Sequence, residues 1–207
     1  MRIITMGCGY IGSVLAAELA EALPSAQITI SDTDISRVRE TCRRMVKGDV
    51  YPLQLDLSSS PKLAHVLRDF DLGVGLAPGK LGYRTVRASI EAGLDMVDLS
   101  YMPEDPLSLN EEAQKARVTV IPDCGLAPGL SNILVGRAAS LLDQVSDVQI
   151  LVGGLPEENI PPLGCKLTWC LEDLIEEYVR RAKILRDGRL IEVEALEGLE
   201  EIHFPEV

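Results

Sequence analysis

Short apolar runs alternate with amphipathic helical patterns over the first 121 residues. Runs rich in β-branched and apolar residues predict strands at 3–6, 27–31, 50–55, 72–76, 96–99 and 118–121. Between them, apolar residues at helical spacing predict helices at 11–23, 35–46, 61–68, 83–92 and 105–116. Because strands that alternate with helices through short connections form βαβ units, the pattern predicts an α/β fold with a doubly wound parallel sheet.

The pattern changes after Pro122. Apolar residues at helical spacing predict a helix at 130–142, and a β-branched run predicts a strand at 145–152. Three further features follow, namely a short strand at 166–169, a helix at 172–181 and two strands around an Asp187-Gly188 turn. An Asp-Gly pair between two strands is typical of a type I′ hairpin, so an antiparallel meander is expected to begin in this part of the chain.

A glycine-rich motif lies between the first predicted strand and the first predicted helix. Gly7, Gly9 and Gly12 fit the pattern G-x-G-x-x-G. In this context the first glycine permits a tight turn, the second lets the backbone approach a pyrophosphate, and the third lets the helix pack on the strand. We therefore predict that this loop, with Tyr10 and Ile11, binds a dinucleotide at the helix N-terminus. The alternative is a glycine turn that binds no ligand.

Asp32 follows Gly12 by 20 residues and ends the second predicted strand. A carboxylate there can accept hydrogen bonds from both ribose hydroxyls of an adenosine and would repel a 2′-phosphate. No arginine follows directly, since Arg37 and Arg39 belong to the next predicted helix. The sequence therefore favours NAD over NADP as the cofactor.

Other loops at strand ends are also candidates for cofactor binding, because ligands of such sheets bind outside the carboxyl ends of the strands. Asp56 and Leu57 follow the third strand and are expected beside the adenine. Ala77 and Pro78 follow the fourth strand and Ser100 follows the fifth, so these residues are expected near the nicotinamide ribose. Ordinary turn formation is the alternative role for each loop.

Polar residues after the fifth and sixth strands are candidates for catalysis. Asp98, Tyr101 and Asp123 are expected at the rim where a nicotinamide would lie, where they could orient a substrate or move a proton. A helix cap or a turn is the alternative role for each of them. His65 and His203 are the only histidines, and both are expected far from this rim, so neither is a good candidate for a general base.

Composition excludes several classes of function. With 20 basic and 32 acidic residues the net charge is −12, and no basic patch suggests nucleic-acid binding. Five cysteines without ligand spacing predict reduced thiols and no metal site. We expect no membrane association and a cytoplasmic location, because no leader is visible and uncharged stretches such as 124–136 are too short to span a bilayer.

The sequence resembles the saccharopine dehydrogenase-like family over essentially its whole length, with the lysine 6-dehydrogenase branch as the nearest. The residues that match lie at the glycine motif and at several later segments: Asp98-Leu99-Ser100, 122–132, Thr168-Trp169, Glu176-Glu177-Tyr178 and Arg186-Asp187-Gly188.

This resemblance implies an NAD-binding Rossmann domain at 1–125, followed at 126–207 by the N-terminal part of an α+β substrate and dimerisation domain. The family's later strands and returning helix are absent from the sequence, so we expect this second domain to be incomplete. Ending the predicted meander at Val207 would leave a strand edge unpaired, and we expect a homo-oligomer to cover it.

The implied reaction is NAD-dependent oxidation of a CH–NH2 or CH–NH group in an amine or amino acid. Relatives that form saccharopine have Asp within Gly-Leu-Asp-Pro-Gly where this sequence has Ala127, which favours the lysine 6-dehydrogenase reaction over the saccharopine reaction. Asp98, Tyr101 and Asp123 are the expected polar groups on the substrate side. Two alternatives stay open: an NAD-binding module without turnover, and a dehydrogenase of carboxylated polyamines.

Overall fold

The computed structural model describes residues 1–45, 48–154, 160–162, 164, 166 and 170–201. The chain divides into two compact units, Met1–Gly154 and Leu155–Val207. Within the described residues, no helix has the length and apolar character needed to cross a membrane.

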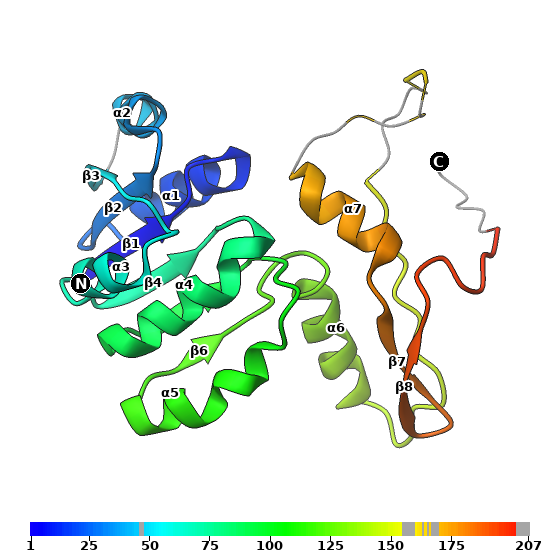
Figure 1. Cartoon of the computed structure of the whole chain (residues 1–207). Helices are drawn as coiled ribbons and strands as arrows, with labels where there is room; N and C mark the ends of the chain where they lie inside the picture. Colours follow the sequence, from blue (N-terminus) through cyan, green and yellow to red (C-terminus); the bar gives the residue numbers. More distant parts are fainter. Residues whose placement is uncertain (46–47, 155–159, 163, 165, 167–169, 202–207) are drawn as a thin grey trace. The chain divides into compact units, whose positions relative to one another are not determined.

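A parallel sheet of six strands forms the centre of the first unit (Figure 1). Its strands are β1 (Arg2–Met6), β2 (Gln27–Asp32), β3 (Asp49–Gln54), β4 (Leu72–Gly75), β5 (Met96–Asp98) and β6 (Val120–Ile121). They lie in the order β3-β2-β1-β4-β5-β6, and every neighbouring pair is parallel. The strand order reverses between β1 and β4, so the predicted doubly wound fold is confirmed.

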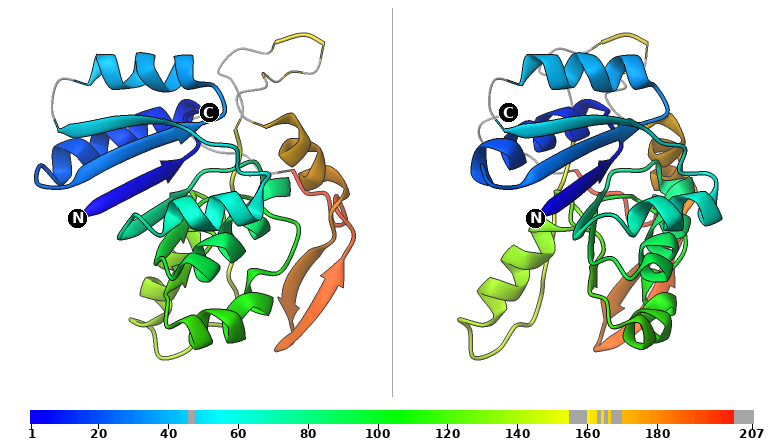
Figure 2. Two further views of the ribbon diagram at one scale, coloured as in Figure 1. Left: turned by 60° about the vertical axis from the view of Figure 1, so that its left-hand side comes forward. Right: turned by 90° about the vertical axis from the view of Figure 1, so that its left-hand side faces the viewer.

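Helices cover both faces of this sheet. They are α1 (Tyr10–Ala22), α2 (Ile35–Arg44), α3 (Ser60–Leu67), α4 (Gly79–Ala92) and α5 (Asn110–Ala116), the last preceded by a 3₁₀ turn at Pro106–Leu109. Figure 2 shows α1 and α2 on one face and α3 and α4 on the other. Successive strand residues point to opposite faces, so Ile3 packs with the α1 and α2 cluster while Ile4 packs with the α3 and α4 cluster.

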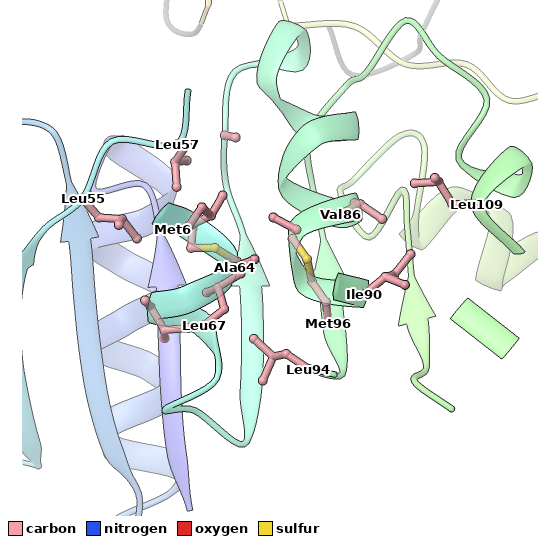
Figure 3. Close-up of a cluster of buried hydrophobic side chains, with 14 of the residues drawn as sticks. Met6, Leu55, Leu57, Ala64, Leu67, Val86, Ile90, Leu94, Met96 and Leu109 are labelled. Carbon is pink, nitrogen blue, oxygen red and sulfur yellow. The ribbon is translucent and has the colours of Figure 1, made fainter. Parts of the chain in front are cut away.

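The α3 and α4 cluster contains the side chains shown in Figure 3. Met6 and Met96 from the sheet lie beside Leu67 of α3 and Val86 and Ile90 of α4. Each of these five side chains is buried. This packing fixes α4 against β4 and β5, the strands whose ends form one half of the candidate site.

The apolar residues of α1 and of its C-cap differ in their burial, since Leu15, Leu19 and Leu23 are partly buried against the α1 and α2 cluster whereas two others are exposed. Ile11 and Val14 are 62% and 63% exposed. The buried residues are small instead, namely Gly12, Ala16 and Ala20. Small residues at this spacing allow a helix to lie close to the sheet, which apolar periodicity alone does not reveal.

Two predicted elements end or begin differently in the structure. Helix α4 begins at Gly79, whereas the predicted helix begins at residue 83. The predicted start is too late because the glycines in the first turn of α4 weaken the helical signal in the sequence. The segment predicted as a strand at 145–152 is irregular, so that prediction is wrong. A strand needs a paired neighbour, and no described strand pairs with this segment.

The remaining elements follow the first sheet along the chain. Helix α6 (Leu130–Ala139) belongs to the first unit, and the second unit contains α7 (Leu171–Val179), β7 (Ala182–Arg186) and β8 (Arg189–Val193). β7 and β8 are antiparallel, and Asp187 and Gly188 between them have φ of 52° and 72°, as a type I′ turn requires. Residues 167–169 of the strand predicted at 166–169 lie outside the described residues.

Candidate nucleotide-binding site

The three motif glycines have different surroundings in the turn between β1 and α1. Gly7 has φ of 129°, and a Cβ there would lie 2.6 Å from the carbonyl oxygen of Leu76. A Cβ on Gly12 would overlap with the carbonyl oxygen of Gly7. At Gly9, by contrast, a Cβ would meet nothing within 4 Å. Gly7 and Gly12 therefore make the turn compact, and Gly9 presents its open side to an incoming group.

Helix α1 begins directly after Gly9, which is its N-cap. No side chain caps this helix end, and among the described residues of its first turn none is acidic. The positive end of the helix dipole is therefore not neutralised locally, which suits an anionic pyrophosphate. Tyr10 and Ile11, predicted to contact the cofactor, are 85% and 62% exposed beside this helix end.

Asp32 is held against the glycine turn by main-chain hydrogen bonds. The N–H of Cys8 donates to its Oδ2 at 2.9 Å, and the N–H of Asp34 donates to its Oδ1 at 3.0 Å. The main chain adds a further link, since the N–H of Gly7 donates to the carbonyl of Ser31 at 2.9 Å. Oδ1 also accepts a hydrogen bond from the Thr33 hydroxyl at 3.3 Å, so the remaining lone pair of Oδ2 is the one that could accept a hydrogen bond from a ribose hydroxyl.

The start of α2 is capped by Asp34, whose Oδ1 accepts hydrogen bonds from the N–H groups of Ser36 and Arg37. The hydrogen bond from the Ser36 hydroxyl and the one from the Arg37 main chain lower the pKa of Asp34. Arg37 Nε lies 4.0 Å from Asp34 Oδ2. The cation nearest to Asp32 in the sequence is thus beside a second carboxylate.

The loops after β3 and β4 differ in how much side chain they expose. Asp56 accepts a hydrogen bond from the Ser58 N–H at 2.9 Å, which lowers its pKa and stabilises the turn before α3. Leu57 and Ala77 are buried in the α3 and α4 cluster. Pro78 is exposed and is the N-cap of α4. Of these four predicted cofactor contacts, Asp56 and Pro78 have exposed side chains.

Asp98 ends β5 and is completely buried, with 0% of its surface exposed. Its Oδ1 accepts hydrogen bonds from the N–H of Ser100 at 2.9 Å and from the Ser100 hydroxyl. Its Oδ2 has no hydrogen-bond partner among the described residues. Burial raises the pKa of Asp98 to about 7, the hydrogen bonds from Ser100 oppose this rise, and the charge of Asp123 adds to it.

The sequence predicts that Asp98 contacts the substrate, and its complete burial argues against a direct contact. A side chain without exposed surface does not reach a substrate in this conformation, and the residue that donates hydrogen bonds to Asp98 is Ser100. Ser100, predicted as a cofactor contact, is itself only 3% exposed. Tyr101, the next residue, is half-buried and follows Ser100 toward the surface.

Asp123 lies in the turn after β6 and is half-buried with φ of 55°. Burial raises its pKa, and the charge of Asp105 raises it further. The next residue, Cys124, donates its N–H to the carbonyl of Asp98 at 2.8 Å, so the loops after β5 and β6 are joined. The structure thus brings Asp98, Ser100 and Asp123 to neighbouring strand ends, as the sequence predicts.

Two glycines that support this arrangement were not predicted as site residues. A Cβ on Gly75 of β4 would overlap with Oδ2 of Asp98, and a Cβ on Gly82 of α4 would overlap with the Ser100 hydroxyl. An isolated glycine inside a strand or helix is the available sequence signal, because it marks a close approach of other atoms. As for metals, the described part of the chain contains no cluster of three or more potential ligands from His, Cys, Asp or Glu.

Residues 3–121 match the family model described as "Saccharopine dehydrogenase NADP binding domain", and residues 125–207 match the one described as "Saccharopine dehydrogenase C-terminal domain". The chain belongs to the saccharopine dehydrogenase family. The predicted family resemblance is confirmed, and residues 3–121 correspond to its pyridine-nucleotide-binding domain. The family models meet near residue 125, whereas the compact units divide after Gly154, so the predicted domain boundary stays a prediction.

Curated relatives are longer than this chain. Over 199 residues it is 25% identical to mitochondrial alpha-aminoadipic semialdehyde synthase of Mus musculus, covering 93% of this chain and 21% of that protein. Over 178 residues it is 26% identical to saccharopine dehydrogenase [NADP(+), L-glutamate-forming] of Saccharomyces cerevisiae, covering 78% of this chain and 39% of that relative.

A solved structure supports the fold. The apo saccharopine dehydrogenase (L-Glu forming) from Saccharomyces cerevisiae superposes with a TM-score of 0.72 at 21% identity, covering 99% of this chain and 47% of that one. This agreement extends the confirmed fold class to a parallel Rossmann-like sheet followed by a small antiparallel sheet.

Proposed function

We propose that this chain binds NAD(H) and belongs to an oxidoreductase that acts on the CH–NH2 or CH–NH group of an amino acid. The observation that supports the cofactor most directly is the position of Asp32. Its carboxylate is bonded to the Cys8 N–H inside the glycine turn, so the group that would bind the ribose and the turn that would bind the pyrophosphate are joined.

The choice of NAD over NADP rests on charge, although the family model and the yeast relative are named for NADP. A 2′-phosphate at this ribose would lie against the Asp32 carboxylate, which costs affinity through like-charge repulsion. Arg37, the nearest arginine along the chain, already has the Asp34 carboxylate 4.0 Å from its Nε, although this exposed ion pair is weak. These contacts favour an unmodified ribose.

The proposed substrate class rests on the family and on the acidic residue Asp123 in the turn after β6. When bound, a nicotinamide cofactor accepts or supplies the hydride, and the protein contributes binding and orientation. Asp123 is half-buried at the end of β6, where a carboxylate suits an amine substrate. Both named relatives concern saccharopine or aminoadipic semialdehyde, which supports an amino acid of this type. Ala127 within the loop after β6 favours lysine oxidation over the saccharopine reaction.

The test of this proposal is the substitution Asp32→Ser. Removing a charged acceptor of the ribose hydroxyls should weaken NADH binding about tenfold or more, as measured by calorimetric titration. Binding of NADPH should weaken less or improve, because the repulsive charge is gone. Asp69→Ser is the matched control, since Asp69 is exposed after α3, away from the strand ends.

Equal NADH affinity in the Asp32→Ser variant and in the control would overturn the cofactor assignment. A screen of lysine and related amines with NAD then tests the reaction. Binding of NADH without turnover of any amine would favour a binding module instead.

A further inference from the structure

The Asp98 carboxyl and Ser100 occupy space that two glycines leave open. Asp98 is completely buried, and its Oδ1 accepts both hydrogen bonds that Ser100 can donate. Gly75 of β4 faces Oδ2, and Gly82 of α4 faces the Ser100 hydroxyl, each so closely that a Cβ would overlap with it. The pair is therefore enclosed by β4 on one side and by the first turn of α4 on the other.

Main-chain hydrogen bonds connect the same residues to the neighbouring strand ends. The Leu99 N–H donates to the carbonyl of Gly75 at 2.9 Å, and the Cys124 N–H donates to the carbonyl of Asp98 at 2.8 Å. The segments after β4, β5 and β6 are thus fixed to one another around Asp98. In a doubly wound sheet of this order, β4 to β6 form the half that binds the nicotinamide mononucleotide, while β1 to β3 bind the adenosine half.

We propose that Asp98 and Ser100 are positioning residues for the nicotinamide half of the cofactor, an inference that rests on the proposed NAD(H) binding. Neither residue needs to touch the cofactor, because both are buried. Their hydrogen bonds fix the conformation of residues 99–101, and Tyr101 emerges from this segment half-buried. Asp32 lies at the end of β2, in the part of the sheet proposed to bind the adenosine half, and its hydrogen bonds do not involve Asp98 or Ser100. The two halves of the cofactor site can therefore be perturbed separately.

The experiment compares a ligand that spans both halves with one that occupies the adenosine half alone. Calorimetric titration with NADH and with ADP is carried out on the wild-type chain and on the variants Ser100→Ala and Gly82→Ala. In Gly82→Ala the new methyl group should push the Ser100 side chain away from α4, while the residues at positions 98 and 100 keep their identities. Gly136→Ala is the matched control, because Gly136 also lies in a helix and a Cβ there meets nothing within 4 Å.

We expect both variants to bind NADH about tenfold more weakly, the equivalent of one lost hydrogen bond, and to bind ADP as the wild type does. The control should bind both ligands normally. Asp98→Asn, which keeps an oxygen acceptor for Ser100, should retain most of the NADH affinity, whereas Asp98→Leu should lose it. Circular dichroism melting curves establish that each variant is folded.

Unchanged NADH affinity in Ser100→Ala and Gly82→Ala would overturn the inference and leave the proposed function intact. A parallel loss of ADP binding in folded variants would also overturn it, because the effect would not be confined to the nicotinamide half. Absence of NADH binding by the wild-type chain would instead overturn the proposed function, and this inference with it.

Discussion

Asp32 and Asp98 occupy equivalent places, each as the last residue of a strand, but their environments differ. Asp32 has hydrogen-bond partners on both oxygens and is half-buried, whereas Asp98 is fully buried and one of its oxygens has no partner within the described part of the chain. Burial without full pairing favours the neutral form of a carboxyl group. The same residue type therefore has both oxygens hydrogen-bonded at one strand end and serves as a buried hydrogen-bond acceptor at the other.

Asp98→Asn should change how stability depends on pH. Because the pKa of Asp98 rises from 3.8 to about 7 on folding, the native state binds the extra proton between these values. The contribution of this group to the free energy of unfolding is therefore full below pH 4 and falls as the pH rises to about 7. At about 1.4 kcal/mol per pKa unit, the upper bound of that fall is about 4 kcal/mol.

Urea unfolding between pH 4 and pH 8 checks this expectation. The variant should be less sensitive to pH than the wild type over this interval, since an amide does not titrate. Identical slopes for the two proteins would show that Asp98 is not a buried titrating group.

The three glycines of the turn before α1 differ in the space around their Cβ positions. The Cβ positions of Gly7 and Gly12 are occupied by main-chain atoms of the turn and of the loop after β4, whereas that of Gly9 is open. The motif therefore combines two glycines that allow close packing with one whose Cβ position is open.

Gly12→Ala and Gly9→Ala should separate these two roles. The first variant forces a methyl group into the Gly7 carbonyl and should lower the free energy of unfolding by about 1–3 kcal/mol, measured by urea denaturation. The second should leave stability almost unchanged but weaken NADH binding, because its methyl group lies where the pyrophosphate approaches. Equal loss of stability in both variants would contradict the assignment of a packing role to Gly12 and an open position to Gly9.

Elements with strong periodic patterns could be predicted from the sequence, and those fixed by tertiary packing could not. The alternation of strands and helices up to Ile121 and the Asp187-Gly188 turn are local signals. The small buried face of α1 at Ala16 and Ala20 is not, because the sheet selects it through close approach. The strand predicted at 145–152 failed for a similar reason, since pairing depends on a partner that a periodicity does not specify.

The candidate site is predictable in outline because parallel strands end at one side of a sheet. This rule brought Asp32, Asp98 and Asp123 to the correct strand ends. It did not indicate that Asp98 would be buried, or that Gly75 and Gly82 would make room for it and for Ser100. Those facts depend on contacts between β4, α4 and β5, which no local pattern contains.

At the scale of the whole molecule, a nucleotide-binding half and the following α+β part together match two adjoining family models. The chain spans 39% of its yeast relative and 47% of the superposed yeast structure. The contacts of Asp32 with the glycine turn bear on the cofactor, and the substrate, oligomeric state and cellular location stay predictions.

Titration of the wild-type chain with NADH and with NADPH, under the same salt and pH conditions, is the decisive experiment for the proposed preference for NAD. With the Asp32 carboxylate at the ribose position, we predict that NADH binds at least about tenfold more tightly than NADPH. Binding of NADPH with equal or higher affinity would show that Asp32 does not select an unmodified ribose.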